Sequence, residues 1–168
     1  MTAATIDRVR DMLARSAHLP ELEFATGDAI ITAGTPAGEL WVLVSGSLTV
    51  RKDGEVVNSI SRAGALVGEM AVLLGTDHAI TVEAAEPSRL RVARDADAFL
   101  GEDPETMRLV AYGLAERLNR VTTYLADLKH QYGDTPGLSM VSDVLTHLSV
   151  HQDLPARSGS ARDPDPEY

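Results

Sequence analysis

Residues 67–82 constrain the fold more than any other stretch of the chain. They read Val-Gly-Glu-Met-Ala-Val-Leu-Leu-Gly-Thr-Asp-His-Ala-Ile-Thr-Val. Gly68 and Glu69 precede a short apolar turn that ends at Gly75, and the β-branched run from His78 is typical of a strand. A loop, one helical turn and a strand predict a small cup, where amides at the helix start bind an anion. The Glu69 carboxylate indicates that the ligand also carries hydroxyl groups, because carboxylates accept strong hydrogen bonds from O–H donors.

This stretch resembles the phosphate-binding cassette of cyclic nucleotide-binding domains, the β-roll modules of catabolite-activator-type regulators and protein kinase A regulatory subunits. Residues 68–72, Gly-Glu-Met-Ala-Val, match the first half of the cassette. Residues 78–82, His-Ala-Ile-Thr-Val, match the second half in register. The resemblance implies that Glu69 holds the ribose 2′-hydroxyl and that the backbone amides of Met70 and Ala71 face the cyclic phosphate.

Two positions depart from the family pattern. Asp77 stands where the family has Pro, and His78 stands where it has the Arg that binds the phosphate. Arg offers a permanent bidentate charge, whereas His is charged only part of the time near neutral pH. A charge-assisted hydrogen bond is worth about 1.5–3 kcal/mol, so loss of the Arg costs about one or two decades in affinity. Arg62 and Arg89 are candidates to supply the charge instead.

The residue after His78 bears on which base the cyclic nucleotide carries. In the family a Thr here favours guanine, and Ala or Ser allows adenine, so Ala79 implies cAMP in preference to cGMP. Thr122 and Thr123 are candidates to contact the adenine amino group, although each is equally an ordinary polar helix position. The candidate ligand-binding residues are Gly68, Glu69, Met70, Ala71, His78, Ala79, Thr81, Thr122 and Thr123. Neither catalytic residues nor a metal or cofactor is expected.

Short predicted strands that are separated by glycines run from Leu22 to Val92, which is typical of a β-sandwich or β-roll. Gly27, Gly34 and Gly46 fall where the resembling family keeps its turn glycines. The expected fold is therefore mainly β with flanking helices. It is a cyclic nucleotide-binding β-roll, a double-stranded β-helix jelly roll, followed by a long C-terminal helix.

Five segments are expected along the chain. They are an N-terminal helix over 1–20, the β-roll over 21–93 with its cassette at 67–82, a hinge helix and long dimer helix over 94–132, a short extra helix over 133–150, and a disordered tail over 151–168.

A heptad seam runs along residues 107–132. Its apolar members, spaced alternately by four and three residues, are Met107, Ala111, Leu114, Leu118, Val121, Leu125, Leu128 and Tyr132. A strict seam of this length more often pairs with a second copy of itself than with its own domain. We therefore expect a homodimer through this helix, which is the dimer helix in the resembling regulators.

Charge and cysteine content exclude several classes of function. The formal net charge is −10, which disfavours binding to a nucleic-acid phosphate backbone. The segment after Tyr132 is too short and too acidic for a winged helix-turn-helix. The chain has no Cys, no secretory signal and no apolar run long enough to span a bilayer, so we expect a soluble, cytoplasmic protein that binds neither DNA nor membrane.

Two interpretations follow. The first is a stand-alone cyclic nucleotide-binding regulatory module, without enzyme activity, that acts through an unknown partner protein. The alternative is a degenerate β-roll that no longer binds nucleotide and serves as a dimerisation or interaction module; the replacement of Arg by His78 is its main support.

Overall fold

The computed structural model describes residues 3–132 and 144 of the chain. Two compact units form, residues 1–110 and 111–168. The short helix expected over 133–150 and the tail expected over 151–168 lie outside the described residues, apart from residue 144. None of the described helices is long and apolar enough to cross a membrane.

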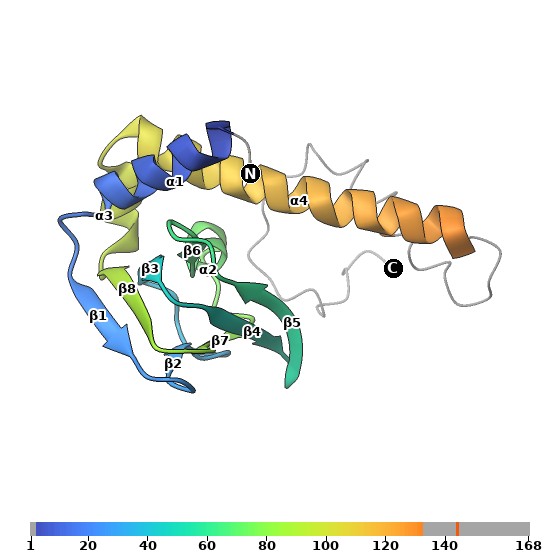
Figure 1. The fold of residues 1–168 in the computed structure, drawn as a ribbon, viewed down its shortest axis with the longest axis horizontal. Helices are drawn as coiled ribbons and strands as arrows, with labels where there is room; N and C mark the ends of the chain where they lie inside the picture. The colour runs from blue at the N-terminus through green and yellow to red at the C-terminus, as the bar shows by residue number, and fades with distance from the viewer. Residues whose placement is uncertain (1–2, 133–143, 145–168) are drawn as a thin grey trace, which may run out of the picture. The chain divides into compact units, whose positions relative to one another are not determined.

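Eight strands of the first unit form two antiparallel four-stranded sheets (Figure 1). One sheet has the order β1-β8-β3-β6 and the other β2-β7-β4-β5. The strands are β1 (Glu21–Phe24), β2 (Ala29–Ile31), β3 (Leu40–Ser45), β4 (Leu48–Lys52), β5 (Glu55–Ile60), β6 (Leu66–Val67), β7 (Thr81–Ala84) and β8 (Ser88–Ala93). The predicted fold, a β-roll followed by a long helix, is confirmed.

One boundary near the cassette differs from the expectation. The strand predicted to start at His78 begins only at Thr81. The backbone of His78 instead bonds to the loop after β2: its N–H donates to the Thr35 carbonyl at 2.9 Å, and its carbonyl accepts from Gly34 N–H at 2.8 Å. These bonds hold residues 78–80 outside the regular ladder.

An apolar core fills the space between the two sheets. Leu43, Leu48, Val82 and Leu90 are completely buried there, and each contributes about 1.5–3 kcal/mol of burial free energy. The Phe24 ring meets the Trp41 ring edge-on, with centroids 5.6 Å apart. Alternate burial along β4 and β7 reflects the period-two pattern expected for strands with one face on a core.

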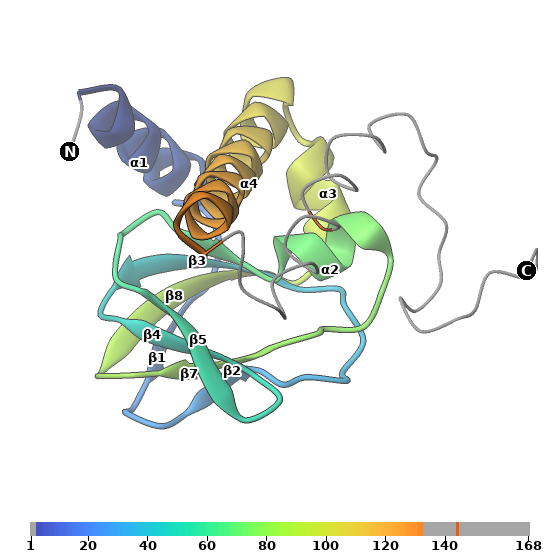
Figure 2. The same cartoon turned by 90° about the vertical axis from the view of Figure 1, so that its right-hand side faces the viewer.

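Within residues 3–132, four helices accompany the sheets: α1 (Ala3–Arg15), α2 (Glu69–Leu74), α3 (Ala96–Gly101) and α4 (Pro104–Tyr132). Arg91 of β8 fixes α1, because its Nη1 donates to the Leu13 carbonyl at 2.7 Å. Arg15 pairs with Asp103 at 2.6 Å, next to the start of α4. Figure 2 shows α2 and α3 beside each other at one end of the roll.

Candidate functional site

Gly68 sets the geometry of the cassette between β6 and α2. Its φ of 96° is left-handed, a conformation that favours glycine. A Cβ at this position would lie 2.9 Å from the carbonyl oxygen of Glu39, the residue before β3, so this close approach also requires glycine. Glu69 follows as the first residue of α2 and is only 2% exposed. The sequence therefore places a buried carboxylate at the start of α2, directly after a sharp turn.

The first turn of α2 contains the two amides that the resemblance assigns to the phosphate. Residues in a first helical turn lack intrahelical acceptors for their N–H groups. Met70 is exposed while Ala71 is buried, so one side of the α2 turn packs against the protein and the other side faces solvent. Left-handed Gly75 ends the helix, and its N–H donates to the Val72 carbonyl at 3.2 Å.

His78 lies close to the start of α2. Its side chain is 8% exposed, and the Cβ position of Gly68 is 3.6 Å from the imidazole Cε1. The structure thus brings together Gly68, Glu69 and His78, which are up to ten positions apart in the sequence numbering. A buried carboxylate beside a helix start can accept a hydrogen bond from a hydroxyl group, and a buried imidazole there can donate one to an anion.

His78 also borders a hollow of about 250 Å³ on the side of β2 and β3. Thr35, Glu39 and Trp41 contribute to its wall. These three residues were not among the predicted site residues. Trp41 is the chain's only Trp and belongs to a strand, but its proximity to His78 depends on strand packing that the sequence does not display.

The other predicted residues occupy varied environments. Ala79 is exposed. The Thr81 Oγ1 accepts a hydrogen bond from Ala33 N–H at 3.1 Å and so fixes the loop after β2. Thr122 and Thr123 belong to the second unit, where the Thr123 hydroxyl donates to the Asn119 carbonyl of its own helix at 2.9 Å.

The two alternative cations are both on the outside of the roll. Arg62 is exposed. Arg89 is exposed on β8, where its Nη1 donates to Glu21 Oε1 at 3.1 Å and its Nε donates to Ser45 Oγ at 3.1 Å. Its guanidinium is therefore engaged on the outer face of a sheet, and His78 is the buried basic side chain of the cassette.

Solved structures with the same fold include cyclic nucleotide-binding proteins. The chain resembles the Thermus thermophilus catabolite activator protein, with a TM-score of 0.54 and 22% identity over 85% of this chain and 83% of that one. It also resembles PKAR CBD2 with Sp-2Cl-cAMPS bound, with a TM-score of 0.52 and 21% identity over 79% and 88% of the two chains.

A third similar structure is the regulatory subunit of a cAMP-independent protein kinase A from Trypanosoma brucei. Its TM-score is 0.50 at 19% identity, over 66% of this chain and 48% of that one. No curated protein sequence matches the chain significantly. The family model for the cyclic nucleotide-binding domain matches residues 21–113, which include the β-roll, the cassette and the start of α4. The chain therefore belongs to the cyclic nucleotide-binding domain family.

Proposed function

We propose that this chain is a regulatory module that binds cAMP and signals to a partner protein without catalysing a reaction. The observation that carries the proposal is the burial of Glu69 beside left-handed Gly68, within a cassette that the family model includes. A carboxylate that the fold holds at the start of α2 can accept a hydrogen bond from a ligand hydroxyl group.

Five residues of the cassette have a chemical role in this proposal. Glu69 accepts the ribose 2′-hydroxyl, and the amides of Met70 and Ala71 donate to the cyclic phosphate. His78 supplies a further donor, which carries a charge when the imidazole is protonated. Ala79 leaves space for adenine.

The signal passes from the cassette to the helices that follow the roll. Ala96 N–H at the start of α3 donates to the Gly38 carbonyl at 3.1 Å, and α2 contacts α3. A ligand that orders α2 therefore biases α3 and, through it, α4. A net charge of −10 favours a protein as the recipient over duplex DNA. We also propose that two copies of the chain form a homodimer through residues 107–132.

Calorimetric titration tests the ligand assignment. We expect saturable cAMP binding that adenosine reproduces only weakly, because adenosine lacks the phosphate. Glu69→Gln should weaken cAMP binding by about tenfold or more, since a hydrogen bond to a charged group is worth about 1.5–3 kcal/mol. Glu55→Gln, at an exposed position of β5, is the matched control and should bind like the unmodified protein.

The degenerate-module alternative is favoured by one residue, His78 in place of the family Arg. The Trypanosoma brucei relative is itself described as cAMP-independent, so the fold alone does not imply cAMP binding. His78→Arg separates the two cases. If the variant binds cAMP and the unmodified protein does not, the alternative is correct. If neither binds while both remain folded by circular dichroism, the cassette assignment fails.

A further inference from the structure

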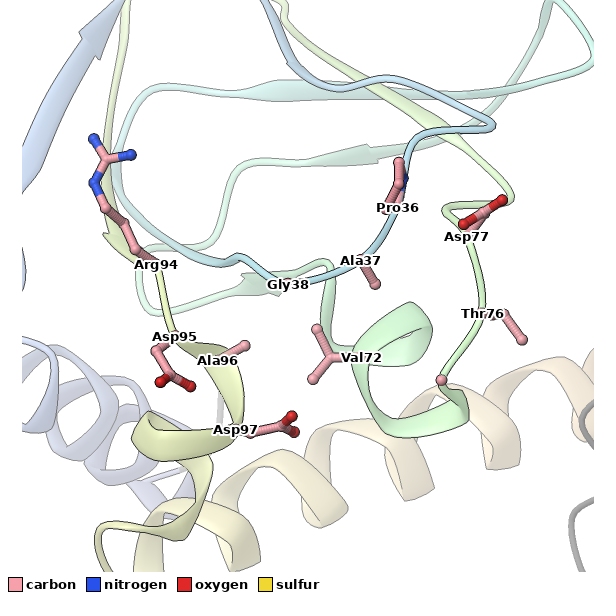
Figure 3. Close-up of a pocket in the computed structure, with 11 residues that line it drawn as sticks. Pro36, Ala37, Gly38, Val72, Thr76, Asp77, Arg94, Asp95, Ala96 and Asp97 are labelled. Atoms are coloured by element: carbon pink, nitrogen blue, oxygen red, sulfur yellow. The ribbon is translucent and has the colours of Figure 1, made fainter.

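Beside the cassette, a depression of about 560 Å³ lies between the loop at residues 36–38, the end of α2 and the start of α3 (Figure 3). It shares Pro36 and Gly38 with the hollow next to His78, so it borders the proposed nucleotide site. The strand β5 offers a separate surface, because none of residues 55–60 lines either space.

β5 has the least protected edge of the two sheets (Figure 1). Within the described residues, the edge strands are β1 and β6 in one sheet and β2 and β5 in the other. β1 carries Glu21 and Glu23, and β2 and β6 have only three and two residues. Short or charged edge strands prevent a sheet from pairing with other chains. β5 is six residues long, and Glu55 is its only charged residue.

Both faces and one edge of β5 are open to solvent. Residues 55–59 are all exposed, and Val56 and Val57 expose 57% and 55% of their surface. β5 pairs with β4, and in the part of the chain that the structure describes no other backbone hydrogen bond reaches residues 55–60. Because N–H and C=O groups alternate between the two edges of a strand, the edge of β5 that faces away from β4 presents donors and acceptors to a further strand.

A β-bulge places Val57 outside the regular pairing with β4. Val50 pairs with Asn58, and Arg51 pairs with Val56. Val57 lies between these pairs and has no opposite residue on β4. Bulges at sheet edges redirect side chains and often lie next to functional sites. β-branched residues stabilise sheets by packing on neighbours across the strand, and this one has no such neighbour on β4.

We propose that β5 is a docking site for the partner protein, which adds an extended segment of its own as a further strand of this sheet. Backbone hydrogen bonds hold such a strand, and contacts to its alternate side chains select its sequence. Val56 and Val57 favour β-branched apolar residues in that segment. The net charge of −10 favours basic residues at its ends.

The size of the edge favours a flexible segment over a second folded copy of the chain. Six residues extend over about 20 Å, and neighbouring strands lie about 5 Å apart. A strip of these dimensions is far smaller than the about 800 Å² per subunit of a stable interface. An extended segment would bind weakly and reversibly, which suits a regulatory partner. The existence of a partner rests on the proposed function, whereas the pairing itself requires no cAMP.

The test uses a peptide with the sequence Lys-Thr-Val-Thr-Val-Thr-Lys, acetylated and amidated at its ends. Its control is the same peptide N-methylated at the five central residues, which keeps the side chains and the charge but removes the backbone donors. NMR of the full chain without cAMP records amide shifts and hydrogen exchange. We expect the first peptide to cause saturable shifts and slower exchange at residues 55–60, and the control to cause neither. Equal binding of both peptides, no binding, or shifts centred elsewhere would overturn the proposal and would leave the calorimetric test of cAMP unaffected.

Two variants locate the peptide on β5. Val56→Asp removes an apolar contact and should weaken binding by about tenfold. Its added charge attracts the cationic peptide, so charge cannot explain a loss. Leu22→Asp makes the same kind of change on β1, an edge strand of the other sheet, and should have no effect. Equal losses in both variants would contradict a site on β5.

A third variant covers the case in which Val56→Asp disturbs the hairpin. Val57→Thr keeps the shape and the strand preference of valine but replaces a methyl group, so we expect about a fourfold loss. Unchanged binding in Val57→Thr would then refute the site. Slower exchange at residues 55–60 that increases with protein concentration, without any peptide, would mean that a second copy occupies the edge and would overturn the assignment to a partner protein.

Discussion

Gly46 and Gly54 both adopt positive φ, yet only Gly46 meets another part of the roll. At Gly46, a Cβ would lie 2.2 Å from Ser88 Oγ and 2.7 Å from Ser88 Cα. At Gly54 nothing lies within 4 Å of that position. Ser88 is also fixed, because its hydroxyl donates to the Glu86 carbonyl at 2.7 Å. The turn between β3 and β4 is thus locked against the start of β8.

Alanine variants of Gly46 and Gly54 distinguish the free-energy cost of a strained backbone from the cost of overpacking. We expect Gly46→Ala to lower the free energy of unfolding by about 2–5 kcal/mol, because left-handed backbone costs about 1–2 and overpacking about 1–3. Gly54→Ala should lower the free energy of unfolding only by the cost of the left-handed backbone, about 1–2 kcal/mol. Urea unfolding measures both. Equal losses in the two variants would contradict the close approach of Ser88.

At His78 the cassette can be compared directly with the family pattern, which has Arg. An arginine presents a permanent charge and a planar fork of donors to a phosphate, whereas a histidine has at most two N–H donors. We therefore expect His78→Arg to bind cAMP about tenfold or more tightly than the unmodified protein.

A second variant at the same position tests the role of the side chain. His78→Gln, which is never charged, should bind cAMP more weakly than the unmodified protein. The carboxylates of the same region, buried Glu69 and Glu39 in the wall of the hollow, are unchanged in all three proteins. Calorimetry gives the affinities. Equal affinities of the three proteins would show that another group binds the phosphate.

At the scale of elements, contiguous patterns were predictable and long-range contacts were not. The cassette at 67–82 and the heptad pattern over 107–132 depend on residues close together in the chain, so both could be predicted from the sequence. The hydrogen bond from Arg91 to Leu13 joins segments separated by 78 positions, and no local pattern encodes it. The wall that Glu39 and Trp41 form around His78 likewise depends on how the strands pack.

The Asp103 side chain stabilises the start of α4 through hydrogen bonds. Its Oδ2 accepts from the Thr106 hydroxyl at 2.8 Å, and its Oδ1 accepts from Glu105 N–H at 2.7 Å, within the first turn of α4. The hydrogen bond from the Thr106 hydroxyl lowers the pKa of the Asp103 carboxyl most. The N–H groups of Glu105 and Thr106 and the charge of Arg15 lower it further, so the pKa lies below its usual value. The folded state therefore favours the ionised carboxylate.

The sign of the resulting acid sensitivity follows from linkage. Because the folded-state pKa of Asp103 lies below the unfolded value, its contribution to stability is present above the unfolded pKa and is lost as pH falls through the folded pKa. We expect Asp103→Asn to flatten the fall in unfolding free energy below about pH 5. Asp97→Asn, which removes the same charge from α3, should keep the original slope. Urea unfolding from pH 5 to pH 2 compares them, and equal slopes in all three proteins would refute the linkage.

At the scale of the whole molecule, the heptad seam of α4 determines the expected assembly. Leu118 and Val121 of that seam are 54% and 50% exposed, although both are apolar. Two parallel copies of the helix would bury them, at about 25 cal/mol per Å² of apolar surface. We therefore expect a dimer, and we expect Leu118→Asp combined with Leu125→Asp to give monomers, because the double change places like charges at the contact.

The matched control introduces the same two charges one position further along the helix. Asn119→Asp combined with Ala126→Asp changes exposed residues off the seam and should leave the dimer intact. Multi-angle light scattering over a concentration series measures the mass of each protein, and circular dichroism shows whether α4 remains helical. A monomeric unmodified protein would rule out the seam as a dimer contact. Dissociation of the control would assign the effect to charge on the helix as a whole, because the seam residues are untouched in it.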